Sequence, residues 1–381
     1  MKPTAEMKEQ GNDMLDSRYV IDGISCKLTP RQMLSGQESS GGSGEIIVDE
    51  SVDPAPQGSG LSREHLFEYI YKVLPLCKDK GEIPAFCPES ATLTKICTCL
   101  SALIWRKGHF RLEDLCLGLD WEWDFSQTGN AAAFYRSVEA VCGFTDSIDV
   151  RISRYSLTHS NSCSIEADAT LDTDCCNLPH LKAEDEFSVS EVKSPYLSEG
   201  RTCLEQVSED KNNWIIYIPF DTCACNLGGS ALSEATGIPC GIAPDLSDPD
   251  YFIDCYEVVR EFSEDGIFVS GIDIGRGGLG AALARLCGPD RGMDIDLGSV
   301  LSLDKSGDIL KILFSEIPGV LVEIRDSDFD YLDAEMLLQD VAYYPIGHPG
   351  KAGLRISSKD NPGIAGILIS LMDNRAPEGE D

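Results

Sequence analysis

Basic residues are scarce in this chain of 381 residues, which has 31 Lys and Arg against 64 Asp and Glu. The formal net charge is therefore −33 at pH 7. Positive patches supply much of the affinity of proteins for nucleic acids and anionic membranes, so neither is an expected partner. The same acidity opposes the binding of nucleotide phosphates unless glycine amides, arginines or Mg²⁺ compensate it locally. A solvated acidic face is the simpler interpretation of the charge.

Long hydrophobic segments are also missing. No apolar run reaches the roughly eighteen residues that a membrane-spanning helix needs. The first ten residues, MKPTAEMKEQ, lack the apolar core of a secretory signal. Sixteen cysteines are present, but no CxxC pair is repeated at zinc-binding spacing, and many lie in apolar runs where cysteine acts as a small hydrophobe. These features predict a protein of the reducing cytoplasm.

Common catalytic motifs do not occur, since the chain has no GxSxG elbow, Walker loop or HExxH helix. Three acids, Asp120, Glu122 and Asp124, alternate along the predicted strand Leu115–Phe125 and would therefore share one face of it. They could hold a metal, but a solvent-exposed strand face is the simpler interpretation.

The first half of the chain divides into a predicted arm and a mixed domain. Polar tracts such as GQESSGGSGE predict a disordered arm over residues 1–60, within which the short run Tyr19–Ile24 could be a strand or a docking segment. We expect a domain over 61–205 that begins with a pair of helices, the second capped by Ser90. Its polar stretch at 159–203 is an insertion, an edge hairpin or a linker. The other elements predicted here are the helices Leu61–Leu76, Ser90–Arg106 and Ala131–Cys142 and the strand Val150–Leu157.

The second half, residues 206–372, alternates predicted strands and helices, which favours an α/β (α+β) fold. Residues 373–381 read as a solvated tail. The predicted helices are Tyr251–Phe262 and Ala334–Val341, and the predicted strands are Trp214–Phe220, Ile309–Phe314, Gly319–Ile324 and Leu354–Ile356, followed by the apolar run Ile364–Leu371.

The stretch Gly266–Cys287 predicts a strand, a glycine turn and a helix of small residues. The first amides of such a helix have no partner within it, and the positive end of the helix dipole adds to their attraction for an anion, usually a phosphate. Asp273, at the end of the strand, could hold a metal or a ribose hydroxyl. The alternative is a tight connection that needs glycine only for its dihedral angles.

Four motifs occur in order after residue 213, namely LGGSAL, DIGRGGLGAALA, GMDIDL and LFSEIPG. In this order and spacing the chain resembles the C-terminal domain of the aminoimidazole ribonucleotide synthetase superfamily, and within it the phosphoribosylformylglycinamidine synthases. The resemblance covers roughly residues 213–370. It implies a PurM-like C-terminal domain preceded by an eroded N-terminal PurM-like domain.

The resemblance also implies a function: ATP-dependent amidine formation in purine synthesis, with ATP and Mg²⁺ as cofactors. It implies a homodimer and a glutaminase or other purine-synthesis subunit that supplies ammonia. No catalytic residue and no metal ligand is assigned by it. The residues that it marks for binding phosphate or another ligand are Gly228, Gly229, Ser230, Asp273, Gly275, Arg276, Gly277, Gly278 and Glu316.

The chain departs from the family pattern at the central turn. The synthases have a His-Asp pair followed by Ile-Ser-Asp-Gly-Gly, whereas Ile272, Gly275 and Arg276 stand here at the histidine, serine and second aspartate positions. The GDD-type and TTD-type segments of the N-terminal domain are not found. The planar fork of Arg276 suits phosphate, and an arginine before Gly-Gly-Leu also resembles the hydrogenase-maturation members. His348, at a turn, is interpreted as structural.

Two hypotheses follow from this pattern. The chain is an ATP-using, amidine-forming protein or one module of it. Alternatively, it is a non-catalytic relative that binds a phosphate-bearing ligand or partner, or a hydrogenase-maturation-like ATP-binding protein.

Overall fold

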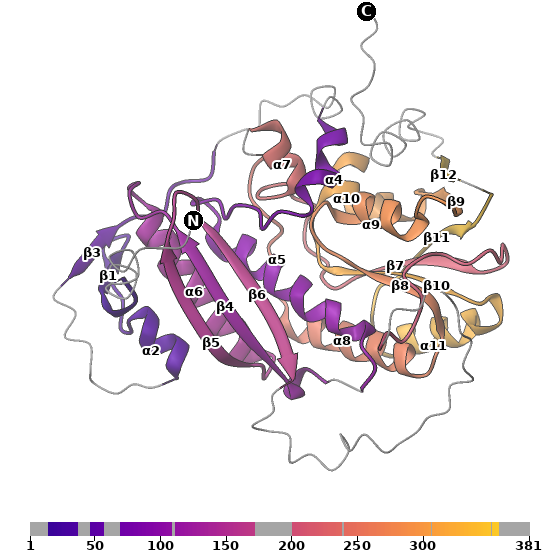
Figure 1. Cartoon of the computed structure of the whole chain (residues 1–381), viewed down its shortest axis with the longest axis horizontal. Coiled ribbons are helices and arrows are strands. Elements are labelled where there is room, and N and C mark those ends of the chain that lie inside the picture. Colours follow the sequence, from indigo (N-terminus) through magenta and orange to yellow (C-terminus); the bar gives the residue numbers. More distant parts are fainter. Residues whose placement is uncertain are drawn as a thin grey trace, which may run out of the picture.

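The computed structural model describes residues 14–36, 46–56, 69–108, 111–171, 200–237, 240–305, 307–351 and 353–357. Over these ranges the chain forms three β-sheets surrounded by helices, which confirms the α/β (α+β) prediction (Figure 1). No helix in these ranges is long and apolar enough to cross a membrane. The predicted run Ile364–Leu371 and the tail at 373–381 lie outside the described residues.

A six-stranded sheet forms the centre of the C-terminal half, with the strand order β12-β9-β11-β7-β10-β8. Alternation along its strands divides the core. On β7, Ile215 and Tyr217 join one buried cluster while Ile216 and Ile218 join the other. Its strands are β7 (Trp214–Pro219), β8 (Phe268–Ile274), β9 (Gly292–Asp296), β10 (Gly319–Ile324), β11 (Tyr344–Pro349) and β12 (Gly353–Ser357).

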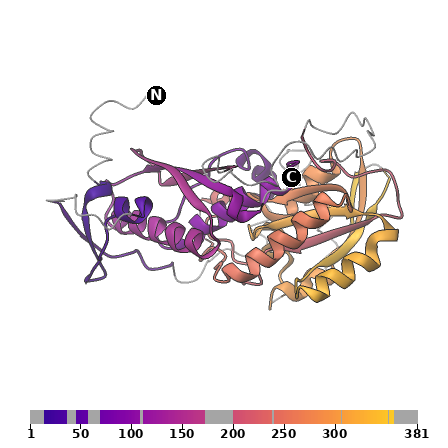
Figure 2. The ribbon, with the colours of Figure 1, turned by 90° about the horizontal axis from the view of Figure 1, so that it is seen from below.

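Helices cover both faces of this sheet, so its central strands β7 and β10 are mostly apolar, with Glu323 of β10 as a buried exception. One face packs against α9 (Gly278–Cys287), α10 (Ile309–Phe314) and the short α7 (Ala231–Thr236). The other packs against α8 (Pro249–Glu264) and α11 (Phe329–Leu338), as Figures 1 and 2 show.

The prediction of a strand at Ile309–Phe314 is wrong, because these residues form α10. Asp308 caps the helix by accepting the Leu310 amide at 3.0 Å. Five of the six residues, all but Lys311, are buried, and a short run with so little polar contrast gives no periodicity to separate helix from strand.

A three-stranded sheet, β5-β4-β6, lies in the N-terminal half. Strand β4 (Leu115–Trp123) pairs in parallel with β5 (Arg151–His159) and antiparallel with β6 (Ser164–Leu171). The helix α6 (Asn130–Ser147) covers one face, where the buried ring of Phe134 packs edge-on against two tryptophans of β4. Strand β6 falls within the polar stretch whose structure the sequence left open.

The helix α5 (Pro88–Ser101) packs on α6 and also contacts β6, β8 and β10, so it lies between the two larger sheets (Figure 1). The prediction that Ser90 caps it is wrong. The N-cap is Cys87, because Pro88 occupies the first helical position, where its missing amide costs nothing. Of the predicted helix Leu61–Leu76, residues 61–68 lie outside the described part. A 3₁₀ turn at Ile70–Lys72 leads into α4 (Val73–Leu76).

Residues 14–36 and 46–56 of the predicted arm are folded, and the run Tyr19–Ile24 contributes to strands, as one of the two sequence alternatives had it. They form a small sheet of β1 (Arg18–Ile21), β2 (Ile24–Ser25) and β3 (Ile47–Glu50). The helix α2 (Pro30–Ser35) lies between β2 and β3 in the sequence. The sheet is stable because Tyr19 and Ile21 are fully buried, with the Tyr19 ring 4.9 Å from that of Tyr135 on α6. A few apolar residues in a polar tract were sufficient for docking.

Candidate functional site

The glycine turn between β8 and α9 has the predicted shape. Gly277 and Gly278 have φ values of +89° and +64°, which other residues rarely adopt. A side chain on Gly278 would lie 2.5 Å from the Ser315 carbonyl oxygen, so the turn is closed against the end of α10. The glycines therefore serve both the dihedral angles and the close packing of this connection.

A second glycine loop, Gly228-Gly229-Ser230, leads into α7 next to this turn. Gly229 has a φ of +72°, and a side chain on Gly228 would run into the backbone at Gly241–Ala243. Ser230 is the N-cap of α7, with its Oγ accepting the Ser233 amide at 3.2 Å. The first residues of α7 and α9, which follow loops about fifty residues apart in the sequence, thus lie next to each other.

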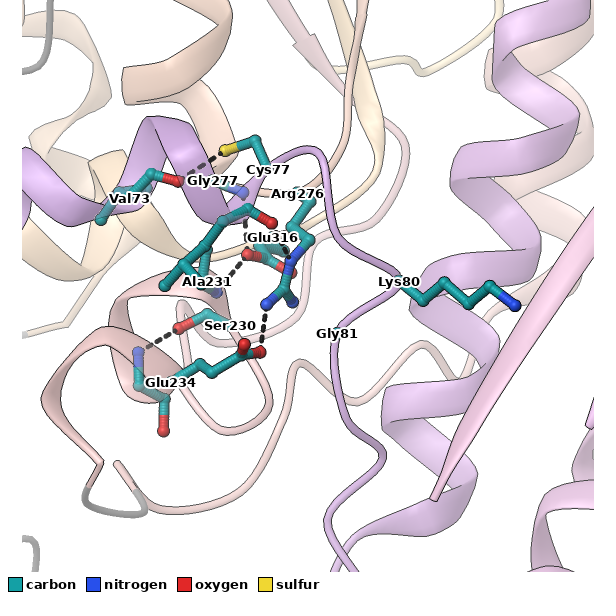
Figure 3. Close-up of polar contacts among 12 residues, drawn as sticks. Val73, Cys77, Lys80, Gly81, Ser230, Ala231, Glu234, Arg276, Gly277 and Glu316 are labelled. Atoms are coloured by element: carbon teal, nitrogen blue, oxygen red, sulfur yellow. Dashed lines mark hydrogen bonds and ion pairs between the residues drawn. The ribbon is translucent and has the colours of Figure 1, made fainter. Parts of the chain in front are cut away.

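Glu316 joins the two loops. Its Oε1 accepts the amide of Ala231 at 2.6 Å and the amide of Gly277 at 2.8 Å (Figure 3). We call this arrangement the carboxylate cradle. Burial raises the pKa of Glu316, while Arg276 and the two amides act in the opposite direction. The carboxylate therefore occupies the position at which the sequence predicted an external anion.

Arg276 is engaged as well. Its Nε donates to the Leu76 carbonyl at 2.9 Å, and its Nη2 forms an ion pair with Glu234 of α7 (Figure 3). Only 12% of its side chain is exposed. A ligand phosphate could reach the guanidinium only in exchange for one of these partners.

Of the predicted ligand-binding residues, the structure brings together the two glycine loops, Arg276 and Glu316. The carboxylate of Asp273 pairs with Arg285 of α9 at 3.8 Å.

The last residue of α4 and the segment that follows it, residues 76–83, pass beside the glycine turn, and we call them the strap. A side chain on Gly277 would lie 2.5 Å from the Sγ of Cys77, at the start of the strap. Lys95 of α5 donates to the backbone carbonyls of Lys80 and Gly81, the latter at 2.7 Å. Burial and the nearby Arg276 lower the pKa of Lys95 to about 8.

Lys95 and the strap escaped the sequence analysis. The available signal was that Lys95 is the one charged residue between Ser90 and Trp105.

A similar carboxylate is found at the start of α6 in the N-terminal half. The Oε2 of Glu50, on β3, accepts the amides of Gly129 at 3.0 Å and Ala131 at 3.1 Å. Gly129 has a φ of +92°. A side chain on it would lie 3.1 Å from the Oδ1 of Asp53, three residues after Glu50. In both halves of the chain, an intrinsic carboxylate holds the amides of a glycine turn at a helix start.

The three acids predicted to share a strand face are each partnered, but β4 ends at Trp123, so only Asp120 and Glu122 lie on the strand. The alternation was correct, and Asp120 receives hydrogen bonds from Arg154 and Ser156, each at 2.6 Å. Glu122 forms an ion pair with Lys80 of the strap at 3.0 Å. The carboxylate of Asp124 accepts the amide of Ser126. Within the described ranges, no three His, Cys, Asp or Glu side chains are grouped to hold a metal ion.

His348 has a packing role, as the sequence suggested, but it lies in strand β11, opposite Asp294 of β9, and not at a turn. Its ring lies 4.2 Å from the Trp214 ring, and its Nδ1 is 2.9 Å from the Asn213 carbonyl oxygen.

Comparison with known proteins agrees with the resemblance seen in the sequence. Residues 213–352 match the family model described as AIR synthase related protein, C-terminal domain. Human phosphoribosylformylglycinamidine synthase is 22% identical over 247 residues, which cover 64% of this chain and 17% of that protein. The probable membrane antigen 75 of Saimiriine herpesvirus 2 is 24% identical over 237 residues, which cover 62% of this chain and 16% of that protein. The chain thus spans a small part of the length of both relatives.

Among solved structures, T. maritima PurL complexed with FGAR matches with a TM-score of 0.52 and 13% sequence identity. The match covers 81% of this chain and 45% of that chain. At this identity the likeness shows the fold alone.

Proposed function

We infer that residues 213–352, which match the family model described as AIR synthase related protein, C-terminal domain, form a domain of that family. From this premise we propose that the chain is a phosphoribosylformylglycinamidine synthase-related protein that binds a phosphate-bearing ligand or partner without completing amidine formation alone. The observation that carries the proposal is the carboxylate at each glycine turn, Glu316 in one half and Glu50 in the other. Any anionic ligand at either turn has to compete with a built-in anion.

The binding partner of the ligand would be Arg276. Its guanidinium is the cation nearest to the cradle that already pairs with an acid, Glu234, at the mouth of the site. Two oxygens of a tetrahedral phosphate can accept a bidentate pair of hydrogen bonds from a guanidinium, as the two oxygens of a carboxylate can, and the phosphate carries more charge.

A second candidate function is ATP-dependent amidine formation in purine synthesis, as one module that also uses ATP and Mg²⁺. It is favoured by the extent of the similarity to the human enzyme, since 247 residues reach beyond the 140-residue C-terminal domain. This function would call for a glutaminase or other subunit as the ammonia source. Hydrogenase-maturation-like ATP binding fits the same Arg276 and the glycines after it.

Isothermal titration with ATP and Mg²⁺ tests the proposal on wild type, Arg276→Ala and Arg355→Ala. Arg355, on the edge strand β12, is a matched control because it also pairs with an acid, Asp294 of β9. Micromolar binding that is lost in Arg276→Ala and kept in Arg355→Ala would support the proposed site. Absence of heat with ATP, ADP and formylglycinamide ribonucleotide would refute it.

Turnover of formylglycinamide ribonucleotide with ATP and ammonia would decide for the second candidate. The proposed homodimer is tested separately by light scattering, which gives the mass of the particle in solution. A mass near 41.5 kDa would refute it.

A further inference from the structure

The strap makes contacts that resemble those of a ligand. Three of its backbone carbonyl oxygens accept hydrogen bonds from two cations: Leu76 from Arg276, and Lys80 and Gly81 from Lys95. Cations of this kind are satisfied more fully by anionic oxygens than by carbonyls. The strap thus fills positions that phosphate oxygens could take.

Lys95 has an incomplete set of partners for a buried cation. Within the described residues no carboxylate lies within ion-pair distance of its Nζ, and the charges that influence it are Arg276, Glu316, Glu234 and Glu82. Burial disfavours an ammonium group that pairs only with carbonyls. An anion beside Lys95 and Arg276 would therefore be stabilised by both.

The strap closes on Arg276 only because residue 81 is glycine. Its φ is +67°, and a side chain there would overlap the guanidinium of Arg276. On its other side, Lys80 forms ion pairs with Glu122 at 3.0 Å and Glu166 at 2.8 Å, on β4 and β6. Figure 3 shows Lys80 directed away from Arg276. The strap is thus held to both halves of the chain.

We propose that the strap is an internal occupant of the site, and that a phosphate-bearing ligand binds Arg276 and Lys95 by displacing its carbonyl oxygens. The inference rests on the proposed function and adds its regulation: the site is closed until the strap leaves. Lys95 binds the ligand in the open form. In the closed form it holds the strap through the carbonyls of Lys80 and Gly81, and we call it the latch.

Gly81→Ala is the variant that separates closure from binding. The added methyl group opposes closure on Arg276 but removes neither cation, so pyrophosphate should bind about tenfold more tightly than to wild type. Lys95→Gln should bind about tenfold or more weakly, since a charged donor is lost. Lys78→Gln, at an exposed lysine of the same strap, should bind within about twofold of wild type.

A readout in wild type does not depend on any variant folding. Trypsin cleaves after Lys80 only when that side chain leaves Glu122 and Glu166, so pyrophosphate should accelerate this cut about tenfold over sodium chloride of equal ionic strength. Cuts elsewhere report general unfolding.

The outcomes separate the two proposals. Tighter binding to Gly81→Ala together with faster cleavage after Lys80 supports strap displacement. Pyrophosphate binding with the same affinity in wild type and Gly81→Ala, and an unchanged rate of cleavage, overturns strap displacement and leaves the proposed function standing. No binding to either protein overturns the proposed function, and strap displacement with it.

Discussion

Removal of the Glu316 carboxylate should destabilise the C-terminal half measurably. In Glu316→Ala, the amides of Ala231 and Gly277 lose their shared acceptor in a site where Glu316 is only 8% exposed. Each unsatisfied buried amide costs about 1–3 kcal/mol. The relief of a buried charge and the entry of water offset part of this. We expect the free energy of unfolding to fall by about 2–4 kcal/mol.

Glu316→Gln separates hydrogen bonding from charge. The amide side chain keeps one carbonyl oxygen for the two backbone donors, so the expected loss is below about 1.5 kcal/mol. Glu113→Ala, at an exposed acid next to β4, serves as the control and should change stability by less than about 0.5 kcal/mol.

Equilibrium unfolding in urea measures these differences, with an unchanged m-value as the check that the compactness of the two states is preserved. A loss of less than about 1 kcal/mol in Glu316→Ala would refute the claim that the cradle holds the two helix starts.

The pH dependence gives a second check. Because burial raises the pKa of Glu316, the folded state takes up a proton more readily than the unfolded state. The stability of wild type relative to Glu316→Gln should therefore increase as the pH falls from 7 toward 4.5. A constant difference would contradict the raised pKa.

Three further predictions concern the turn, the sheet and the latch. Gly277→Ala should cost about 2–4 kcal/mol, since φ is +89° and the new methyl would lie 2.5 Å from the Cys77 Sγ, whereas Gly266→Ala meets no atom within 4 Å and should show the smaller strain alone in the same urea assay. Glu323→Ala should cost about 3 kcal/mol or more, because this fully buried acid accepts hydrogen bonds from Ser208, Asn213 and Ser270; a loss below about 1 kcal/mol would mean that water replaces it. The lowered pKa of Lys95 means that the unfolded state binds more protons between about pH 8 and 10.4, so wild type should gain stability over Lys95→Gln across that range, and equal differences at pH 7 and 10 would contradict the shift.

Local patterns in the sequence predicted most elements of the C-terminal half. The β-branched run of β8, the glycines after it and the small residues of α9 lie where the structure has them. Each of these signals comes from neighbouring residues, whose dihedral preferences and apolar spacing act within a few positions. The error at α10 has the same origin, because an apolar run buried on nearly all sides has little local contrast.

The candidate site could be predicted only in part. The motifs marked Gly228, Gly277, Arg276 and Glu316, but the sequence suggested free amides at the turn. Glu316 accepts these amides because the segment after α10 lies beside the starts of both helices. The contacts span 39 residues to Gly277 and 85 residues to Ala231. The preferences of neighbouring residues cannot predict a contact between residues so far apart in the sequence.

The sequence alone determined the turn geometry, the strand and helix periodicities, the acidity and the resemblance of the C-terminal domain. Only the tertiary structure decided which anion the turn holds, and that Lys95 and the strap close over it. The physical reason is that dihedral and burial preferences are local, whereas the pairing of a buried charge depends on which distant segments the packed core brings together.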